Sequence, residues 1–122
     1  MIKPVGSDEL QPRFVYDTEL HAKLMKEAET LPSVVISSQA AGNAVMMGAG
    51  YFNPLKGFMS VADGMGAAEK MTLTDGSFFP VPVLCLLENT DAIGSAKRIA
   101  LRDPNMEGNP VLAIMDIDKI ET

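Results

Sequence analysis

The stretch GAGYFNPLKGFMS, residues 48–60, is the densest cluster of glycine, proline and aromatic residues in this 122-residue chain. Three glycines and one proline surround Tyr51, Phe52 and Phe58, and Lys56 is its only charged residue. Two interpretations compete. A glycine-rich loop can cradle a phosphate, whereas a rigid turn can hold apolar side chains against another surface.

The composition is that of an ordinary globular protein, and the length fits a single domain. The chain is 47% hydrophobic and 21% charged, with a formal net charge of −6. Because an acidic domain repels phosphate backbones, nucleic acid is an unfavourable partner. No stretch approaches the ~20 apolar residues of a membrane span, and the N-terminus lacks a signal-peptide core, so we expect a cytoplasmic protein with no membrane partner.

The beginning of the chain predicts an arm rather than a helix. Pro4, Gly6 and Pro12 are spaced so that they disfavour helix formation. We therefore expect an extended N-terminal arm over residues 1–16 and a single domain over residues 17–122.

Capping signals predict three short helices in the N-terminal half. Asp17 or Thr18 caps the first, and its apolar residues follow at spacings of three and four. Ser38 caps the second, over residues 39–47, and Ser60 begins a capping box that starts the third. The side chains expected to face inward are Leu20, Leu24, Ala28 and Leu31 in the first helix, Ala40, Ala41, Ala44 and Val45 in the second, and Val61, Met65 and Ala68 in the third.

Strand signals dominate the C-terminal half. After a short β-branched run at residues 33–37, a period-two pattern appears at residues 98–102. Residues 110–120 begin apolar on both faces and alternate from Met115 onward. Asp75-Gly76 lies between apolar runs, as in a tight hairpin. The strand after it is expected to begin at Val83, because the two prolines just before that residue cannot donate to a ladder. Helices followed by antiparallel-type strands predict an α+β fold.

Two fragments imitate the glycine fingerprint of dinucleotide-binding proteins. They are GAGYFN at residues 48–53 and GMGAAE at residues 64–69, and each lacks the third glycine. Neither follows a predicted strand within a βαβ unit, which is the context that gives the motif its meaning. Nucleotide binding is therefore the weaker interpretation of both.

The residues that usually carry chemistry are isolated. His21 is the only histidine and Cys85 the only cysteine, so neither can form a typical zinc site or a disulfide within the chain. Asp116 and Asp118 share one strand face but lack the glycine and distal glutamate of a calcium loop. We therefore predict no catalytic, cofactor-binding or metal-binding residue in this chain.

Five segments follow one another along the chain: LPSVVISS (31–38), GAGYFNPLKGFMS (48–60), MTLTDGSFFPVPVLCL (71–86), IALRD (99–103) and NPVLAIMDID (109–118). In this order they resemble the N-terminal domain of sulfate adenylyltransferase (ATP sulfurylase). The resemblance covers nearly the whole chain from about residue 12 onward, and the ordered series is far more specific than any single segment. The uncharged run QAAGNAV, residues 39–45, is similar to the branch of sulfur-oxidising bacteria.

The resemblance implies a PUA-like, β-rich pseudo-barrel with three short helices, incomplete at its C-terminal end. It implies that the full-length enzyme is a nucleotidyltransferase of sulfur metabolism that interconverts ATP and sulfate with adenosine 5′-phosphosulfate and pyrophosphate. ATP, with Mg²⁺, is then a substrate of the full-length enzyme, and this domain holds no cofactor of its own. The family's catalytic motifs, Gln-x-Arg-Asn-Pro and His-x-x-His, do not occur here. This chain alone is therefore expected to be inactive.

The implied partners are the catalytic domain of the same polypeptide and, in a homo-oligomer, further copies of the enzyme. An open sheet edge would also promote self-association of the isolated chain. A free-standing PUA-like module that binds RNA is the alternative function, which the net charge of −6 opposes. The residues expected to form a rigid turn or an interdomain contact are Tyr51, Phe52, Pro54, Leu55, Gly57, Phe58 and Met59.

Overall fold

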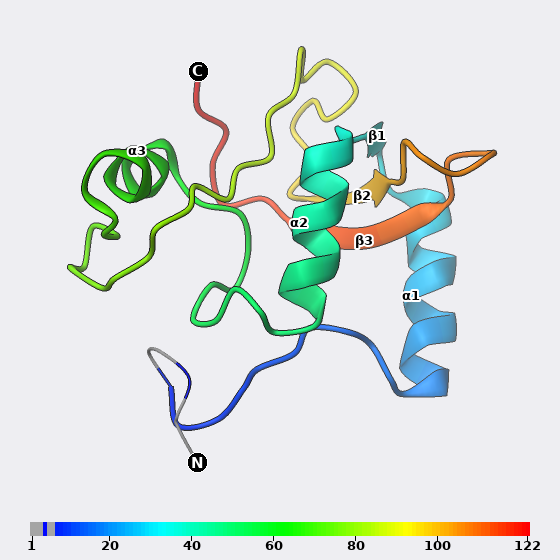
Figure 1. Cartoon of the computed structure of the whole chain (residues 1–122). Coiled ribbons are helices and arrows are strands. Elements are labelled where there is room, and N and C mark those ends of the chain that lie inside the picture. Colours follow the sequence, from blue (N-terminus) through cyan, green and yellow to red (C-terminus); the bar gives the residue numbers. More distant parts are fainter. Residues whose placement is uncertain (1–3, 5–6) are drawn as a thin grey trace.

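The computed structural model describes residue 4 and residues 7–122. These residues form three helices and a three-stranded sheet (Figure 1). The α+β class is thereby confirmed. Residues 7–16 contain no helix or strand, and the rest of the expected arm lies outside the described residues. The elements are α1 (Thr18–Thr30), β1 (Ser33–Val35), α2 (Ser38–Gly48), α3 (Val61–Lys70), β2 (Arg98–Arg102) and β3 (Val111–Asp116).

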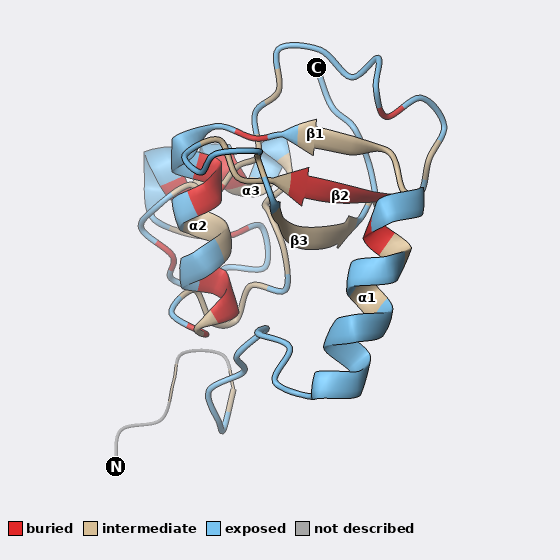
Figure 2. Cartoon of the chain, turned by 90° about the vertical axis from the view of Figure 1, so that its right-hand side faces the viewer, coloured by how far each residue is buried: buried red, intermediate tan, exposed pale blue. Residues whose placement is uncertain are grey.

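The sheet has the order β1-β2-β3 and is mixed. β1 runs parallel to β2, and β3 runs antiparallel to it, with an irregularity in the register between Leu101 and Arg102. In the central strand, Ile99, Ala100 and Leu101 are at most 1% exposed. β2 is therefore covered on both faces, and Figure 2 shows it as the buried strand between two less buried neighbours.

Side-chain caps begin all three helices, as the sequence predicts. The Asp17 carboxylate accepts the Leu20 N–H at 2.7 Å, and the Ser60 hydroxyl accepts the Asp63 N–H at 3.1 Å. The second cap is Ser37 rather than Ser38. Because Ser37 takes the extended conformation of a cap, the helix starts one residue earlier than predicted.

The inward face predicted for α3 is wrong. Val61 is 49% exposed and Met65 is 52% exposed, whereas Gly64 and Ala67 are buried. A Cβ at Gly64 would lie 3.0 Å from a terminal carbon of Leu84, so the helix approaches the following segment along its smallest residues. Close approach of the backbone, rather than bulk of the side chains, decides which face packs.

The hairpin turn is present, but the strand predicted from Val83 is not. Gly76 has a positive φ of 88°, the Leu73 N–H donates to Ser77 O at 2.9 Å, and Thr72 and Phe78 form an isolated bridge. The run from Val83 makes no ladder in the described chain. Instead, Val83 pairs with a single residue of another segment, because the Met59 N–H donates to Val83 O at 2.8 Å.

Two hydrophobic clusters hold these elements together. The first lies against the sheet, and the second joins the end of α2, the turn after it and the hairpin. Their buried members are Ile36, Ala40, Ala41, Ile93, Ile99 and Leu101 in the first cluster, and Met47, Leu73, Phe79 and Val83 in the second. Phe58 packs against both clusters, so the segment that includes residues 48–60 connects the two halves of the core.

Candidate functional site

The two glycines of residues 48–53, Gly48 and Gly50, pack against the N-terminal arm. The Gly48 carbonyl accepts the N–H groups of Arg13 and Phe14 at 2.7 and 3.1 Å. The ring of Phe14 occupies the space where a Cβ of Gly48 would lie. Gly50, at a φ of 85°, would bring its Cβ to 3.0 Å from Leu10. These positions need glycine because another part of the chain packs there, and the phosphate-cradle interpretation loses its basis.

The other fragment with two close glycines, at residues 64–69, lies inside α3. A dinucleotide fingerprint needs its glycines at the turn between a strand and a helix. The middle of a helix offers no such free N–H groups, since they bond within the helix. Neither glycine fragment therefore has the geometry of a nucleotide site.

The remainder of residues 48–60 forms a compact turn with a cis peptide bond between Asn53 and Pro54. Tyr51 is 69% exposed, and Gly57 has no positive φ and would place a Cβ in open space. Lys56 is exposed, and Pro54 and Phe58 are half-buried. The turn residues that pack against the second cluster are Phe52, Leu55, Phe58 and Met59.

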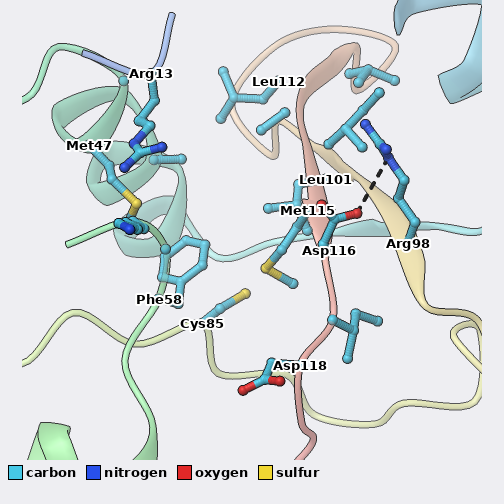
Figure 3. A pocket seen from close by; sticks show the side chains of 18 of the residues that line it. Arg13, Met47, Phe58, Cys85, Arg98, Leu101, Leu112, Met115, Asp116 and Asp118 are labelled. Carbon is cyan, nitrogen blue, oxygen red and sulfur yellow. Dashed lines mark ion pairs between the residues drawn. The ribbon is translucent and has the colours of Figure 1, made fainter. Parts of the chain in front are cut away.

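A hollow of about 980 Å³ lies beside β3 (Figure 3). It runs along the whole of this strand, and every residue from Val111 to Met115 is only half-buried. Helix α1 borders the same space through Leu24, which is half-buried, and Met25, which is 43% exposed. Other apolar lining residues are Met47, Phe58, Met59, Cys85 and Leu87.

Charged groups lie at the rim of this hollow. Arg13 and Lys56 line it on the side of the arm and the turn, and neither has an ion-pair partner in the part of the chain that the structure describes. On the β3 side, Arg98 Nε lies 3.6 Å from Asp116 Oδ1 and 3.2 Å from Glu27 Oε1. Figure 3 shows Arg13 beside Met47 and Asp118 on the β3 side.

His21, Cys85, Asp116 and Asp118 all line this hollow, but no hydrogen bond or ion pair of the described structure joins any two of them. His21 is exposed on α1. Asp116 forms an ion pair with Arg98 and does not share a ligand with Asp118 in the described structure. No group of three or more His, Cys, Asp or Glu residues could hold a metal ion within the described residues. Burial raises the pKa of the Cys85 thiol, which disfavours the reactive thiolate at neutral pH.

The described helices also include none that is long and apolar enough to cross a membrane. The hollow along β3 is thus an apolar surface open to packing. Residues 48–60 were the expected contact surface, and the surface along β3 was not predicted. Its signal was the run VLAIM, residues 111–115, which is apolar on both faces like a strand inside a sheet.

Comparison with known proteins gives a consistent picture. A family model described as a PUA-like domain matches residues 2–122. The chain is 72% identical over 121 residues to the sulfate adenylyltransferase of Allochromatium vinosum, a match that covers 99% of this chain and 30% of that protein. It is 75% identical to the sulfate adenylyltransferase of the Riftia pachyptila sulfur-oxidizing endosymbiont, where the match covers 27% of the relative.

A solved structure has the same fold over nearly the whole chain. It is described as a hexameric APS kinase from Thiobacillus denitrificans, and it matches with a TM-score of 0.75 and 32% sequence identity. The similarity covers 97% of this chain and 23% of that one. The chain thus spans less than a third of the length of each of these three proteins.

Proposed function

The chain belongs to the PUA-like domain family, and on this premise we propose that it is the non-catalytic N-terminal domain of a sulfate adenylyltransferase, where it is a scaffold for a catalytic domain in the same polypeptide. The resemblance seen in five sequence segments is confirmed by these relatives. The observation that carries the proposal is the hollow of about 980 Å³ along β3. The apolar residues 111–115 of this strand border it and are only half-buried.

The proposed enzyme interconverts ATP and sulfate with adenosine 5′-phosphosulfate and pyrophosphate. ATP and Mg²⁺ belong to the remainder of that enzyme, since the described residues of this chain provide no cluster of ligands for a metal ion. This chain then contributes a packing surface. It presents apolar side chains and two cations, Arg13 and Lys56, that have no ion-pair partner among the described residues.

We further propose a cytoplasmic homo-oligomer, in keeping with the hexameric assembly of the related APS kinase from Thiobacillus denitrificans. The RNA-binding alternative has no support from the site. The two unpaired cations are outweighed by a net charge of −6, which would repel a phosphate backbone.

A chimera tests the proposal directly. This chain replaces the 121 matched residues of the Allochromatium vinosum protein, and pyrophosphate release is measured with ATP and sulfate. We expect sulfate-dependent turnover by the chimera and none by the 122-residue chain. Turnover by the chain alone, or a folded chimera without activity, would contradict the proposed function.

A further inference from the structure

One edge of the sheet is formed by β3, a strand whose first five residues lack the charges usual at an exposed edge. β3 carries five consecutive apolar residues, Val111–Met115, on both of its faces. The three central residues of β2, Ile99–Leu101, are almost completely buried, whereas these residues of β3 are all half-buried. Strands that are apolar on both faces normally have both faces covered, and exposed sheet edges are usually short or charged.

The hydrogen-bond pattern shows which groups of β3 are free. The Ala100 N–H donates to Pro32 O at 2.9 Å, so this residue of β2 points its backbone towards β1. The alternation of an antiparallel ladder then assigns the bonded pairs to Ile99–Met115 and Leu101–Ala113. By the same alternation, Ile114 and Asp116 point their N–H and C=O groups away from β2. No described residue bonds to either of these N–H groups.

The space beside this edge suits a further strand. The hollow of about 980 Å³ follows β3 along its length and is lined by apolar side chains of α1, α2 and the turn. In Figure 3, Leu112, Met115 and Phe58 border it. A bonded strand would satisfy the free backbone groups of β3, and its side chains would fill the hollow at the same time.

From the free N–H groups and the hollow together, we infer that β3 is the acceptor edge for an added β-strand, supplied by the remainder of the same sulfate adenylyltransferase polypeptide. The inference rests on the proposed function and names the partner of its surface. In the relatives, most of the polypeptide lies outside the matched part, so such a segment is covalently available at high effective concentration. A second copy of this chain is a poorer occupant, because each copy carries a net charge of −6.

The rim adds a preference for charge in that segment. Arg13 and Lys56 border the hollow without ion-pair partners in the described structure. An acidic side chain at the end of the added strand that reaches these two cations would pair with them. The inferred occupant is therefore an extended segment, apolar along most of its length and acidic at one end.

Amide hydrogen exchange tests the inference residue by residue. In the 122-residue chain, the Ile114 amide should exchange rapidly, whereas the Met115 amide should be protected. In the chimera with the remainder of the Allochromatium vinosum protein, we expect the Ile114 amide to slow by about tenfold or more, while Met115 serves as the internal reference.

Two proline variants provide a matched comparison. Ile114→Pro removes a free N–H at the β3 edge, and Val35→Pro removes an outward N–H at the opposite edge, since the Ile36 N–H already bonds to Arg102 O. Ile114→Pro should lower the melting temperature of the chimera more than that of the chain alone. Val35→Pro should lower both melting temperatures equally.

Each outcome separates this inference from the proposed function. An active chimera in which Ile114 exchanges as fast as in the isolated chain overturns the added strand and leaves the scaffold proposal intact. Slow exchange of Ile114 in a folded but inactive chimera supports the added strand and contradicts the proposed enzyme. Protection of Ile114 that rises with the concentration of the isolated chain identifies a second copy as the occupant, and this overturns the inference.

Discussion

The ring of Phe52, in the turn after α2, packs edge-on against the ring of Phe79, with ring centroids 6.2 Å apart and ring planes inclined at 61°. The contact joins residues 48–60 to the end of the hairpin at Asp75-Gly76. Phe79 is 7% exposed, whereas its neighbour Phe78 is 60% exposed. Adjacent phenylalanines thus have opposite environments.

Phe79→Ala should lower the free energy of unfolding by about 3–5 kcal/mol, because it leaves a cavity in the second cluster. Phe78→Ala is the matched control and should change the free energy of unfolding by no more than about 0.5 kcal/mol. Urea denaturation of both variants gives the comparison. Equal losses would mean that the packing of Phe79 does not distinguish it from a surface ring.

The coupling between Phe52 and Phe79 can be measured separately. A double-mutant cycle with Phe52→Ala and Phe79→Ala should give about 0.5–1.5 kcal/mol, the range for edge-to-face aromatic pairs. Phe58, which lies in the same turn, forms no ring pair with Phe79 among the described contacts. A cycle with Phe58→Ala in place of Phe52→Ala should therefore give a smaller value.

Two helical glycines should respond in opposite directions to alanine. A Cβ at Gly66 in α3 would collide with the carbonyl oxygen of Thr72, whereas a Cβ at Gly42 in α2 would meet nothing within 4 Å. Gly66→Ala should destabilise the domain by about 1–3 kcal/mol through overpacking. Gly42→Ala should stabilise it by about 0.5–1 kcal/mol, because alanine loses less backbone entropy in a helix. Thermal unfolding of both variants measures the contrast, and the same sign for both would be inconsistent with it.

The end of the described chain is tied to the start of α3 by a carboxylate. Glu121 Oε1 lies 2.7 Å from Lys119 Nζ, and Glu121 Oε2 accepts the Val61 N–H at 2.8 Å. The hydrogen bond with Lys119 and the one from Val61 lower the pKa of Glu121 below its ordinary value of 4.5. The stabilisation is therefore present above pH 4.5 and is lost as the pH falls through the lowered pKa in the folded state.

An NMR titration of the Glu121 carboxyl should give a midpoint below 4.5. Lys119→Met removes the largest cause and should move that midpoint upward, while the bond from Val61 keeps part of the shift. A midpoint that Lys119→Met leaves unchanged would assign the shift to another cause.

Cys85 reports on the hollow through its reactivity. Because burial raises the pKa of its thiol above 9.0, alkylation by iodoacetamide at about pH 8 should be several-fold slower in the folded chain than in urea. The rate should rise with pH to a midpoint above 9.0. Equal rates in the folded and unfolded chains would show that the thiol is not desolvated.

Local sequence signals determined the helices and the turn. Asp17, Ser60 and Gly76 have the predicted roles because capping and positive φ depend on a few neighbouring residues. Five segments in order were enough to reveal the family. A single histidine and a single cysteine also gave no cluster from which a catalytic or metal site could be predicted.

Contacts between distant residues decided the rest. Whether α3 packs through Met65 or Gly64 depends on Leu84, which comes twenty residues after Gly64 in the sequence and approaches closely only after folding. Positions 48 and 50 require glycine because Phe14 and Leu10 of the arm lie where a Cβ would be. Likewise, VLAIM predicted a strand, but only the sheet order placed that strand at an edge beside an open hollow. Periodicity reports which side chains prefer burial, whereas the tertiary structure determines which neighbours are there to bury them.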